Sequence, residues 1–265
     1  PAYEFLNLEG DKFSTSRNWA GWLHEFLEAY PTKVDELKYV LTAIAPENKD
    51  SEFTWKEFQS RINNELAAIY GNFVNRTLVL TQKYYEGIIP APNKFSAEDL
   101  LVLKELQEIP ERISKNIYEY KLREAQAEMM NLARLGNKYL ADQEPWKVIK
   151  TDEERVKTIL YIALQITAAL SVASFPFIPD TSKKLQKMLN FSSENWTDLL
   201  QEEVLQAGNK IGEVTSGTMA PSLNKGIGMG YVTTAFSSVG SKINIQIRKN
   251  AISATIVKPP FYKAQ

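Results

Sequence analysis

The sequence of 265 residues contains no cysteine and only one histidine, His24. Without cysteine the chain forms no disulfide and offers no thiolate to a metal ion, and this composition fits a reducing compartment such as the cytoplasm. A single histidine argues against a zinc site and against a histidine-based catalytic triad, although one histidine–carboxylate pair stays open. We therefore expect a cytoplasmic protein without a bound metal.

No stretch has the features of a secretory signal, and no apolar run is both long and uninterrupted. The most apolar segment, residues 159–177, is broken by Gln165, Thr167 and Ser171. We predict a helix buried in the protein core there and not a membrane span, so no membrane partner is expected. Because the first residue, Pro1, falls directly inside a strand-like pattern, we expect the sequence to be a fragment of a longer protein.

Net charge is close to zero, −1 at pH 7, but it is unevenly distributed. From Asn209 to the end the chain has seven Lys and Arg and one Glu, whereas the preceding part has 24 basic and 31 acidic residues. Six of the twelve glycines also lie after residue 208. This double change predicts two modules of different class that join near residues 208–212.

One long amphipathic helix is predicted from Thr54 to Gly87. Thr54 followed by Glu57 is typical of a capping box, in which each side chain bonds a backbone N–H at the helix start. Gly87 and then Pro90 end the pattern. Its apolar face is made by residues that recur at helical spacing, namely Trp55, Phe58, Ile62, Leu66, Ile69, Phe73, Leu80 and Tyr84.

A short strand is expected at residues 2–8. The same helical spacing predicts further helices before and after the one at residues 54–87. They lie at about residues 16–30 and 33–43, followed by a helix that begins at Ser96, a long helix that runs to about Asp142, and finally helices over residues 151–174 and 181–189. Their expected starting caps are Ser16 or Asn18, Ser96 with Asp99, and Thr151 with Glu154, and Pro110 is expected at a helix start or kink. The fold class is therefore predicted as mainly α, with an antiparallel helical bundle over residues 31–208.

After residue 211 the spacing of apolar residues changes to two. Ile243, Ile245 and Ile247 alternate with polar residues, and a second strand is expected over residues 252–257. Residues 209–265 are thus predicted to form a small antiparallel, β-barrel-like domain.

The segment KFSTS, residues 12–16, combines a lysine with hydroxyls before a predicted helix. Lys12 supplies a point charge, while Ser14, Ser16 and free backbone N–H groups can donate to phosphate oxygens. The pattern alone is also that of an ordinary solvated loop. We treat it as a candidate anion site.

Asn72 and Arg76 lie four residues apart on the central helix and point to the same side, off its apolar face. An amide and a guanidinium presented together suit the recognition of bases and phosphates. The alternatives are an ion pair of Arg76 with a carboxylate such as Glu65, and a buried Asn72 amide bonded to the backbone. Asn75 is an alternative reader of the base.

Trp146 follows Pro145 at a predicted break between helices. A ring held there can stack on an unpaired base, a contact worth about 1–3 kcal/mol per base. The alternative is a core tryptophan that packs the break.

Together, three elements in order resemble the C-terminal half of methionyl-tRNA synthetases, a class I family, over about residues 1–208. They are the aromatic strand, turn and KFSTS loop, which is similar to the family's KMSKS loop; the N-x-x-x-R helix at residues 72–76; and the proline–tryptophan element at residues 144–146. Phe13 and Thr15 depart from the KMSKS pattern, and Thr15 removes its second lysine.

The resemblance implies that residues 1–30 end a catalytic region and that residues 31–208 bind an anticodon. It implies ATP, in the full-length enzyme only, as the ligand of the KMSKS-like loop, and methionine tRNA and the missing catalytic domain as partners. The residues implied as catalytic are Lys12, Ser14 and Ser16, and those implied as anticodon-binding are Asn72, Arg76 and Trp146. No H-I-G-H signature or dinucleotide-type βαβ unit is present in the sequence, so we expect no activation of methionine by this chain alone.

Residues 209–265 resemble a different family, the aminomethyltransferase, or T-protein, of glycine cleavage, over its last β-domain. The similar stretches are residues 211–223, 226–232, 243–248 and 257–263. An aminomethyltransferase-like fragment, a chimera of the two families, and a helical interaction scaffold are therefore the alternatives to a tRNA-binding portion of a methionine–tRNA ligase.

Overall fold

A computed structural model describes residues 3–14, 16–191, 193, 205, 207–208, 216–220, 225–229, 242–247 and 250–255. The chain divides into two compact units, Pro1–Gly212 and Glu213–Gln265. The predicted mainly α class holds for the first unit. Thr15, the departure from the KMSKS pattern, lies outside the described residues.

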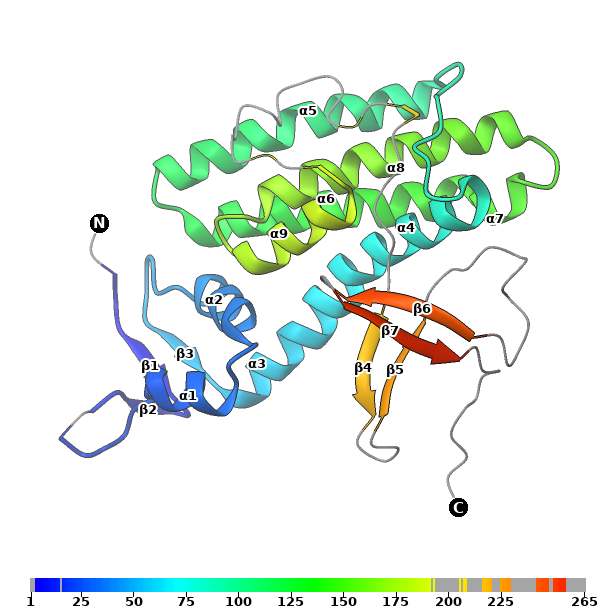
Figure 1. Ribbon diagram of the computed structural model, residues 1–265. Coiled ribbons are helices and arrows are strands. Elements are labelled where there is room, and N and C mark those ends of the chain that lie inside the picture. Colours follow the sequence, from blue (N-terminus) through cyan, green and yellow to red (C-terminus); the bar gives the residue numbers. More distant parts are fainter. Residues whose placement is uncertain are drawn as a thin grey trace. The chain divides into compact units, whose positions relative to one another are not determined.

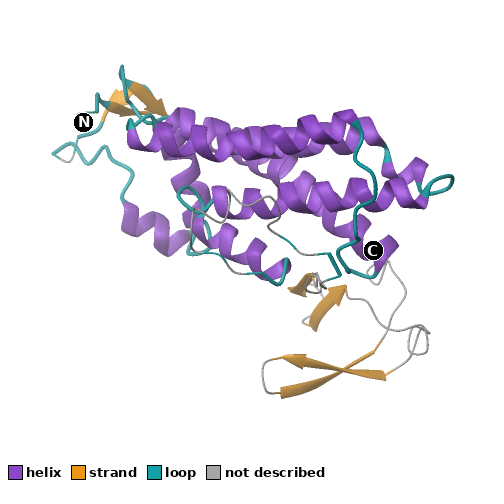
Figure 2. Cartoon of the chain, turned by 90° about the horizontal axis from the view of Figure 1, so that it is seen from above, coloured by secondary structure: helices purple, strands orange, loops and turns teal. Residues whose placement is uncertain are grey.

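A three-stranded sheet lies at one end of the helices of the first unit (Figures 1 and 2). Its order is β2 (Asp11–Lys12), β1 (Leu6–Leu8), β3 (Ser51–Phe53), with β2 antiparallel and β3 parallel to β1. Two helices, α1 (Leu23–Ala29) and α2 (Val34–Ala43), separate β2 from β3. The helix predicted from about residue 16 therefore begins later, because Asn18 takes a positive φ of 51° that no helix accommodates.

The predicted helix of residues 54–87 forms as three consecutive segments, α3 (Trp55–Arg61), the π-helix η1 (Ile62–Gly71) and α4 (Asn72–Tyr85). Thr54 caps its start, since its hydroxyl accepts from the Glu57 N–H at 3.1 Å. The predicted capping box is incomplete, however, because the Glu57 carboxylate bonds Arg61. The predicted apolar face is also only partly buried: Phe73 is fully enclosed, whereas Trp55 is 49% exposed.

The remaining helices are α5 (Ala97–Tyr118), α6 (Leu122–Gln143), α7 (Pro145–Val148), α8 (Glu153–Ala173) and α9 (Pro179–Met188). α8 packs against α4, α5, α6, α7 and α9, and nearly all of its residues are buried. It is long and apolar enough to cross a membrane, but 94% of its most apolar window is buried inside the protein, as expected of a core helix. Figure 1 shows α5, α6 and α8 running side by side.

Three boundaries differ from the sequence predictions. The long helix that Pro110 was expected to start or kink begins later, since α5 continues to Tyr118 and Tyr120 takes a positive φ of 59° between α5 and α6. Pro110 lies inside α5 and not at a start. The cap of α8 is Asp152, whose carboxylate accepts from the Arg155 N–H at 2.9 Å, and not the predicted Thr151.

The described strands of the second unit form two antiparallel pairs. β4 (Ser216–Ala220) pairs with β5 (Lys225–Met229), and β6 (Lys242–Ile247) pairs with β7 (Asn250–Thr255). The alternating apolar pattern therefore predicted the strand at residues 243–247 correctly, while its partner begins two residues before the expected one.

A buried ion pair joins α5 to α8. Asp99 is fully buried and completes the predicted capping box with Ser96, whose hydroxyl accepts from the Asp99 N–H. Arg155 donates to both oxygens of this carboxylate, and the Tyr139 hydroxyl donates to it at 2.7 Å. Although burial alone would raise the pKa of Asp99, the hydrogen bonds from Arg155, Ser96 and Tyr139 lower it overall, so the carboxylate stays charged.

We predict that Asp99→Asn lowers the free energy of unfolding by about 3 kcal/mol at pH 7, because Arg155 loses the charge that compensates it. A carboxyl group with a lowered pKa stabilises the fold above its unfolded pKa of about 4, and this contribution is lost as pH falls further. The difference between variant and wild type should therefore shrink below about pH 4. Urea unfolding followed by helical circular dichroism measures both effects.

Lys157→Ala provides the matched control. Lys157 lies on the same helix, two residues from Arg155, and forms an exposed ion pair with Glu154. Its removal should leave the unfolding midpoint nearly unchanged, because exposed ion pairs contribute little. Equal losses for Asp99→Asn and Lys157→Ala would contradict the stabilising role of the buried pair.

Candidate nucleic-acid interface

The structure brings Arg76 and Trp146 into direct contact. The Arg76 guanidinium carbon lies 5.0 Å from the centre of the Trp146 ring, in a cation–π arrangement. Arg76 comes from the second turn of α4 and Trp146 from α7, and both side chains are half-buried. Two of the residues predicted to act together are therefore neighbours, although they are 70 positions apart in the sequence.

The break before α7 fixes the position of Trp146. α6 ends at Gln143, Glu144 takes a positive φ of 42°, and the buried Pro145 begins α7. Proline suits the first position of a helix, since it lacks the N–H that would have no partner there. Trp146 is therefore positioned by this turn, and part of its surface is accessible.

The guanidinium of Arg76 has no acidic partner in the described part of the chain. No carboxylate among the residues that the structure describes lies within ion-pair distance of Arg76. Glu65, the partner considered from the sequence, is bonded to Arg61 at 3.2 Å and accepts from the Tyr39 hydroxyl. Burial and the bond to Glu65 raise the pKa of Tyr39, so it remains a neutral donor. The positive charge of Arg76 is thus available to a ligand.

Asn72 and Asn75 are both exposed on α4. The Asn72 amide nitrogen donates to the Asn137 side-chain oxygen at 3.2 Å, so the alternative of a buried Asn72 bonded to backbone is wrong. Both residues border an open hollow of about 600 Å³ on η1 and the start of α4. Its lining residues are Asn63, Ala67, Ala68, Gly71, Asn72 and Asn75.

Close packing of α4 on α6 positions this surface. Phe73 is fully buried, and a Cβ atom added to Gly136 of α6 would lie 2.3 Å from its ring. Only glycine leaves room for the ring there, which explains a glycine inside a helical pattern. Asn72 and Arg76 flank Phe73 in the sequence, so this contact sets their distance from α6.

The KFSTS segment is largely exposed and does not lead directly into a helix. Lys12 ends β2, is exposed, and places its Nζ atom 5.0 Å from the Phe5 ring centre. Ser14 pairs with Trp19 through the backbone, and its hydroxyl lies 3.3 Å from that of Ser16. Because α1 starts only at Leu23, the helix N-terminus expected directly after this segment is absent from it.

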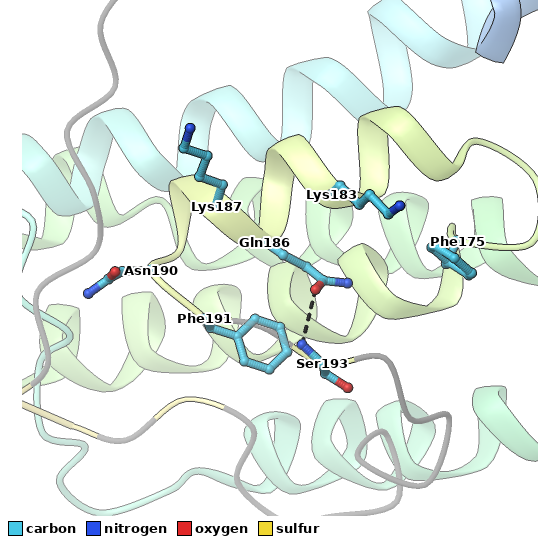
Figure 3. A pocket seen from close by; sticks show the side chains of 7 residues that line it. All are labelled: Phe175, Lys183, Gln186, Lys187, Asn190, Phe191 and Ser193. Atoms are coloured by element: carbon cyan, nitrogen blue, oxygen red, sulfur yellow. Dashed lines mark hydrogen bonds between the residues drawn. The ribbon is translucent and has the colours of Figure 1, made fainter. Parts of the chain in front are cut away.

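A second hollow, of about 480 Å³, lies on α9 and the turn that follows it (Figure 3). Its lining residues are Phe175, Lys183, Gln186, Lys187, Asn190, Phe191 and Ser193. It contains none of the predicted site residues, and its central amide, Gln186, accepts from the Ser193 N–H at 3.1 Å. Across the described part of the chain, no three His, Asp or Glu side chains are grouped to hold a metal ion.

Comparison with known protein families divides the chain in the same way as its composition. The family of class I (M) tRNA synthetases matches residues 1–78, and the anticodon binding domain of methionyl tRNA ligase matches residues 89–216. The glycine cleavage T-protein C-terminal barrel domain matches residues 194–263.

Individual relatives agree with the first two matches. The chain is 60% identical over 215 residues to the methionine–tRNA ligase of Flavobacterium psychrophilum and 60% identical over 220 residues to that of Christiangramia forsetii. Each alignment covers 80% of this chain but only 31% and 32% of the two relatives, so the chain spans about a third of their length. A structure of Mycobacterium tuberculosis methionyl-tRNA synthetase in complex with methionyl-adenylate shares the fold, with a TM-score of 0.72, 24% identity, and coverage of 79% of this chain and 42% of that one.

We predict that Gly136→Ala lowers the free energy of unfolding by about 1–3 kcal/mol, because the added methyl group overlaps the enclosed ring of Phe73. Urea unfolding measures the loss. Gly21→Ala is the control, since a Cβ atom there meets nothing within 4 Å. An unchanged unfolding midpoint for Gly136→Ala would show that α4 and α6 can separate without cost.

Proposed function

Since residues 1–78 and 89–216 match the methionyl-tRNA synthetase family and the relatives of the chain are methionine–tRNA ligases, we propose that this part of the chain binds methionine tRNA through its anticodon. The contact between Arg76 and Trp146 carries the proposal, together with the exposed Asn72 one turn earlier on α4. The first residue offers an uncompensated charge, the second an aromatic face, and the third an amide.

An anticodon is well suited to these groups. Its bases are unpaired in a single-stranded loop, so they can be turned outward and stacked on an aromatic ring. Trp146 would stack on one such base while the Arg76 guanidinium, packed over the same ring, donates to a base edge or a phosphate. Asn72 would bond a base edge, with the exposed Asn75 as the alternative reader.

Catalysis would require the rest of the enzyme. We propose that Lys12, Ser14 and Ser16 contact the ATP triphosphate only when a nucleotide-binding domain is present, because the chain covers about a third of its relatives. The missing catalytic domain is therefore a partner, and ATP is a ligand of the full-length enzyme. As for other translation enzymes of this kind, we propose that the complete protein acts in the cytoplasm.

A second candidate function comes from the match of residues 194–263 to the T-protein barrel domain. It would make the chain an aminomethyltransferase-like fragment or a chimera of two families. The match covers one terminal domain of that enzyme class, so folate-dependent transfer ranks below tRNA binding. A helical interaction scaffold, with no RNA ligand, is the remaining alternative.

Replacing Trp146 by Ala should weaken binding of methionine tRNA by about 1–3 kcal/mol, since the stacked base loses its platform. Filter binding or fluorescence anisotropy with the wild-type and an altered anticodon measures the affinity and the discrimination. The variant should lose affinity for the wild-type anticodon more than for the altered one.

Tyr118→Ala is the control for this experiment, because Tyr118 is an aromatic residue that is 82% exposed at the end of α5. It should leave both affinities unchanged. If the unaltered chain binds the two tRNAs equally, the helical scaffold becomes the better description.

In the full-length parent enzyme, Lys12→Ala should slow formation of methionyl-adenylate at least about tenfold, because Lys12 would stabilise charge that develops on the triphosphate. Binding of tRNA should change much less. Pyrophosphate exchange and tRNA binding, measured side by side, test this separation. A normal exchange rate would remove Lys12 from the reaction.

A further inference from the structure

Asn137 of α6 makes three side-chain hydrogen bonds, two of which connect α6 to η1 and α4. Its amide nitrogen donates to the Ile69 carbonyl of η1 at 2.8 Å and to the Ala133 carbonyl of α6 at 3.1 Å. Its side-chain oxygen accepts from the Asn72 amide nitrogen at 3.2 Å. Asn137 is half-buried, whereas Asn72 is exposed.

These contacts leave only one orientation for the Asn137 amide. A side-chain amide has two N–H donors on one side and an oxygen acceptor on the other. Both donors of Asn137 are used by backbone carbonyls, and a flipped amide would place its oxygen against the Ile69 and Ala133 oxygens. The Asn137 oxygen must therefore face Asn72.

The orientation of Asn72 follows from that of Asn137. Only a nitrogen of Asn72 can face the Asn137 oxygen, because two oxygens would repel each other. The Asn72 oxygen is consequently directed away from Asn137, and no described residue donates to it. The backbone of η1 and α6 thus determines which atom the exposed amide offers to a ligand.

We propose that Asn137 is a positioning residue that holds the Asn72 oxygen outward as a hydrogen-bond acceptor and so selects an anticodon base with an exocyclic amino group. The inference rests on the proposed function, since it assigns the chemistry of the same surface. Methionine is encoded by AUG, so base pairing requires the anticodon CAU. Its cytosine and adenine carry amino donors where uracil and guanine carry carbonyl oxygens.

The test measures binding of the full chain to three methionine tRNAs, with anticodons CAU, UAU and CGU. Each change replaces an amino donor by a carbonyl oxygen, at the first or the second base. The ratio of dissociation constants, altered over CAU, is the discrimination. Asn137→Ala should lower it about fivefold for one of the two changes, because a free Asn72 amide can rotate to accept from an amino group or to donate to a carbonyl oxygen.

A double-mutant cycle separates positioning from simple loss of stability. Asn72→Ala should lower the same discrimination, and adding Asn137→Ala to it should change the ratio by less than about twofold. Asn137→Ser is the second variant, since its hydroxyl can still bond the Ala133 carbonyl one turn back but cannot reach Asn72. It should lose discrimination while keeping the wild-type unfolding midpoint.

Asn131→Ala serves as the matched control. Asn131 is an exposed asparagine on the same helix, bonded to Arg134, and its replacement should leave the ratios unchanged. Full discrimination in folded Asn137→Ala or Asn137→Ser overturns the inference but leaves the proposed function intact. Equal binding of all three tRNAs by the wild-type chain overturns the proposed function, and the inference with it.

Discussion

The burial of α8 is the constraint on which the first unit depends. Five helices pack on it, so its own polar side chains must find partners inside the protein. Thr167 bonds the Ala163 carbonyl one turn earlier, and Gln165 exchanges two hydrogen bonds with the backbone of Leu205. Both α4 and α7 contact this helix, so the distance between the residues of α4 and those of α7 is fixed by their packing on α8. The contact between Arg76 and Trp146 is thus a result of core packing and does not depend on a ligand.

Much of the helical pattern was predictable because its signals are local. The Thr54 cap, the Ser96–Asp99 capping box and the break at Pro145 each depend on residues within one turn of each other. The π-helix η1 was missed, since its apolar spacing fits an α-helix as well. The position of the break between α5 and α6 was missed because Tyr120 takes a positive φ, which is uncommon for a bulky residue.

The residues of the candidate site could be proposed from their types and spacing in the sequence. The contacts that they make with distant parts of the chain could not. Asn72, Arg76 and Trp146 were identified from the sequence, and two of them proved to be neighbours. The suggested pairing of Arg76 with Glu65 was wrong because Arg61 and Tyr39, both nearer in the fold, already bond that carboxylate.

Asn137 could not be singled out from the sequence, since a polar residue on an amphipathic helix is expected on any solvated face. Gly136 could be, because glycine inside a helix weakens it unless close packing requires it.

The two candidate sites of the first unit differ in what holds them, and this difference bears on how a synthetase divides its work. The proposed anticodon surface is anchored by the enclosed Phe73 ring, the Asn137 bonds and the Pro145 turn, all of which belong to this chain. In the KFSTS segment the backbone is paired at Lys12 and Ser14, but the described side-chain contacts are an exposed contact of Lys12 with Phe5 and a hydroxyl contact between two serines. Preorganised groups bind without an ordering cost, whereas exposed long side chains pay rotamer entropy when they are fixed. Under the proposed function, recognition of the tRNA would need only groups of this unit, whereas Lys12 would gain a defined position only from the triphosphate and the domain that binds it.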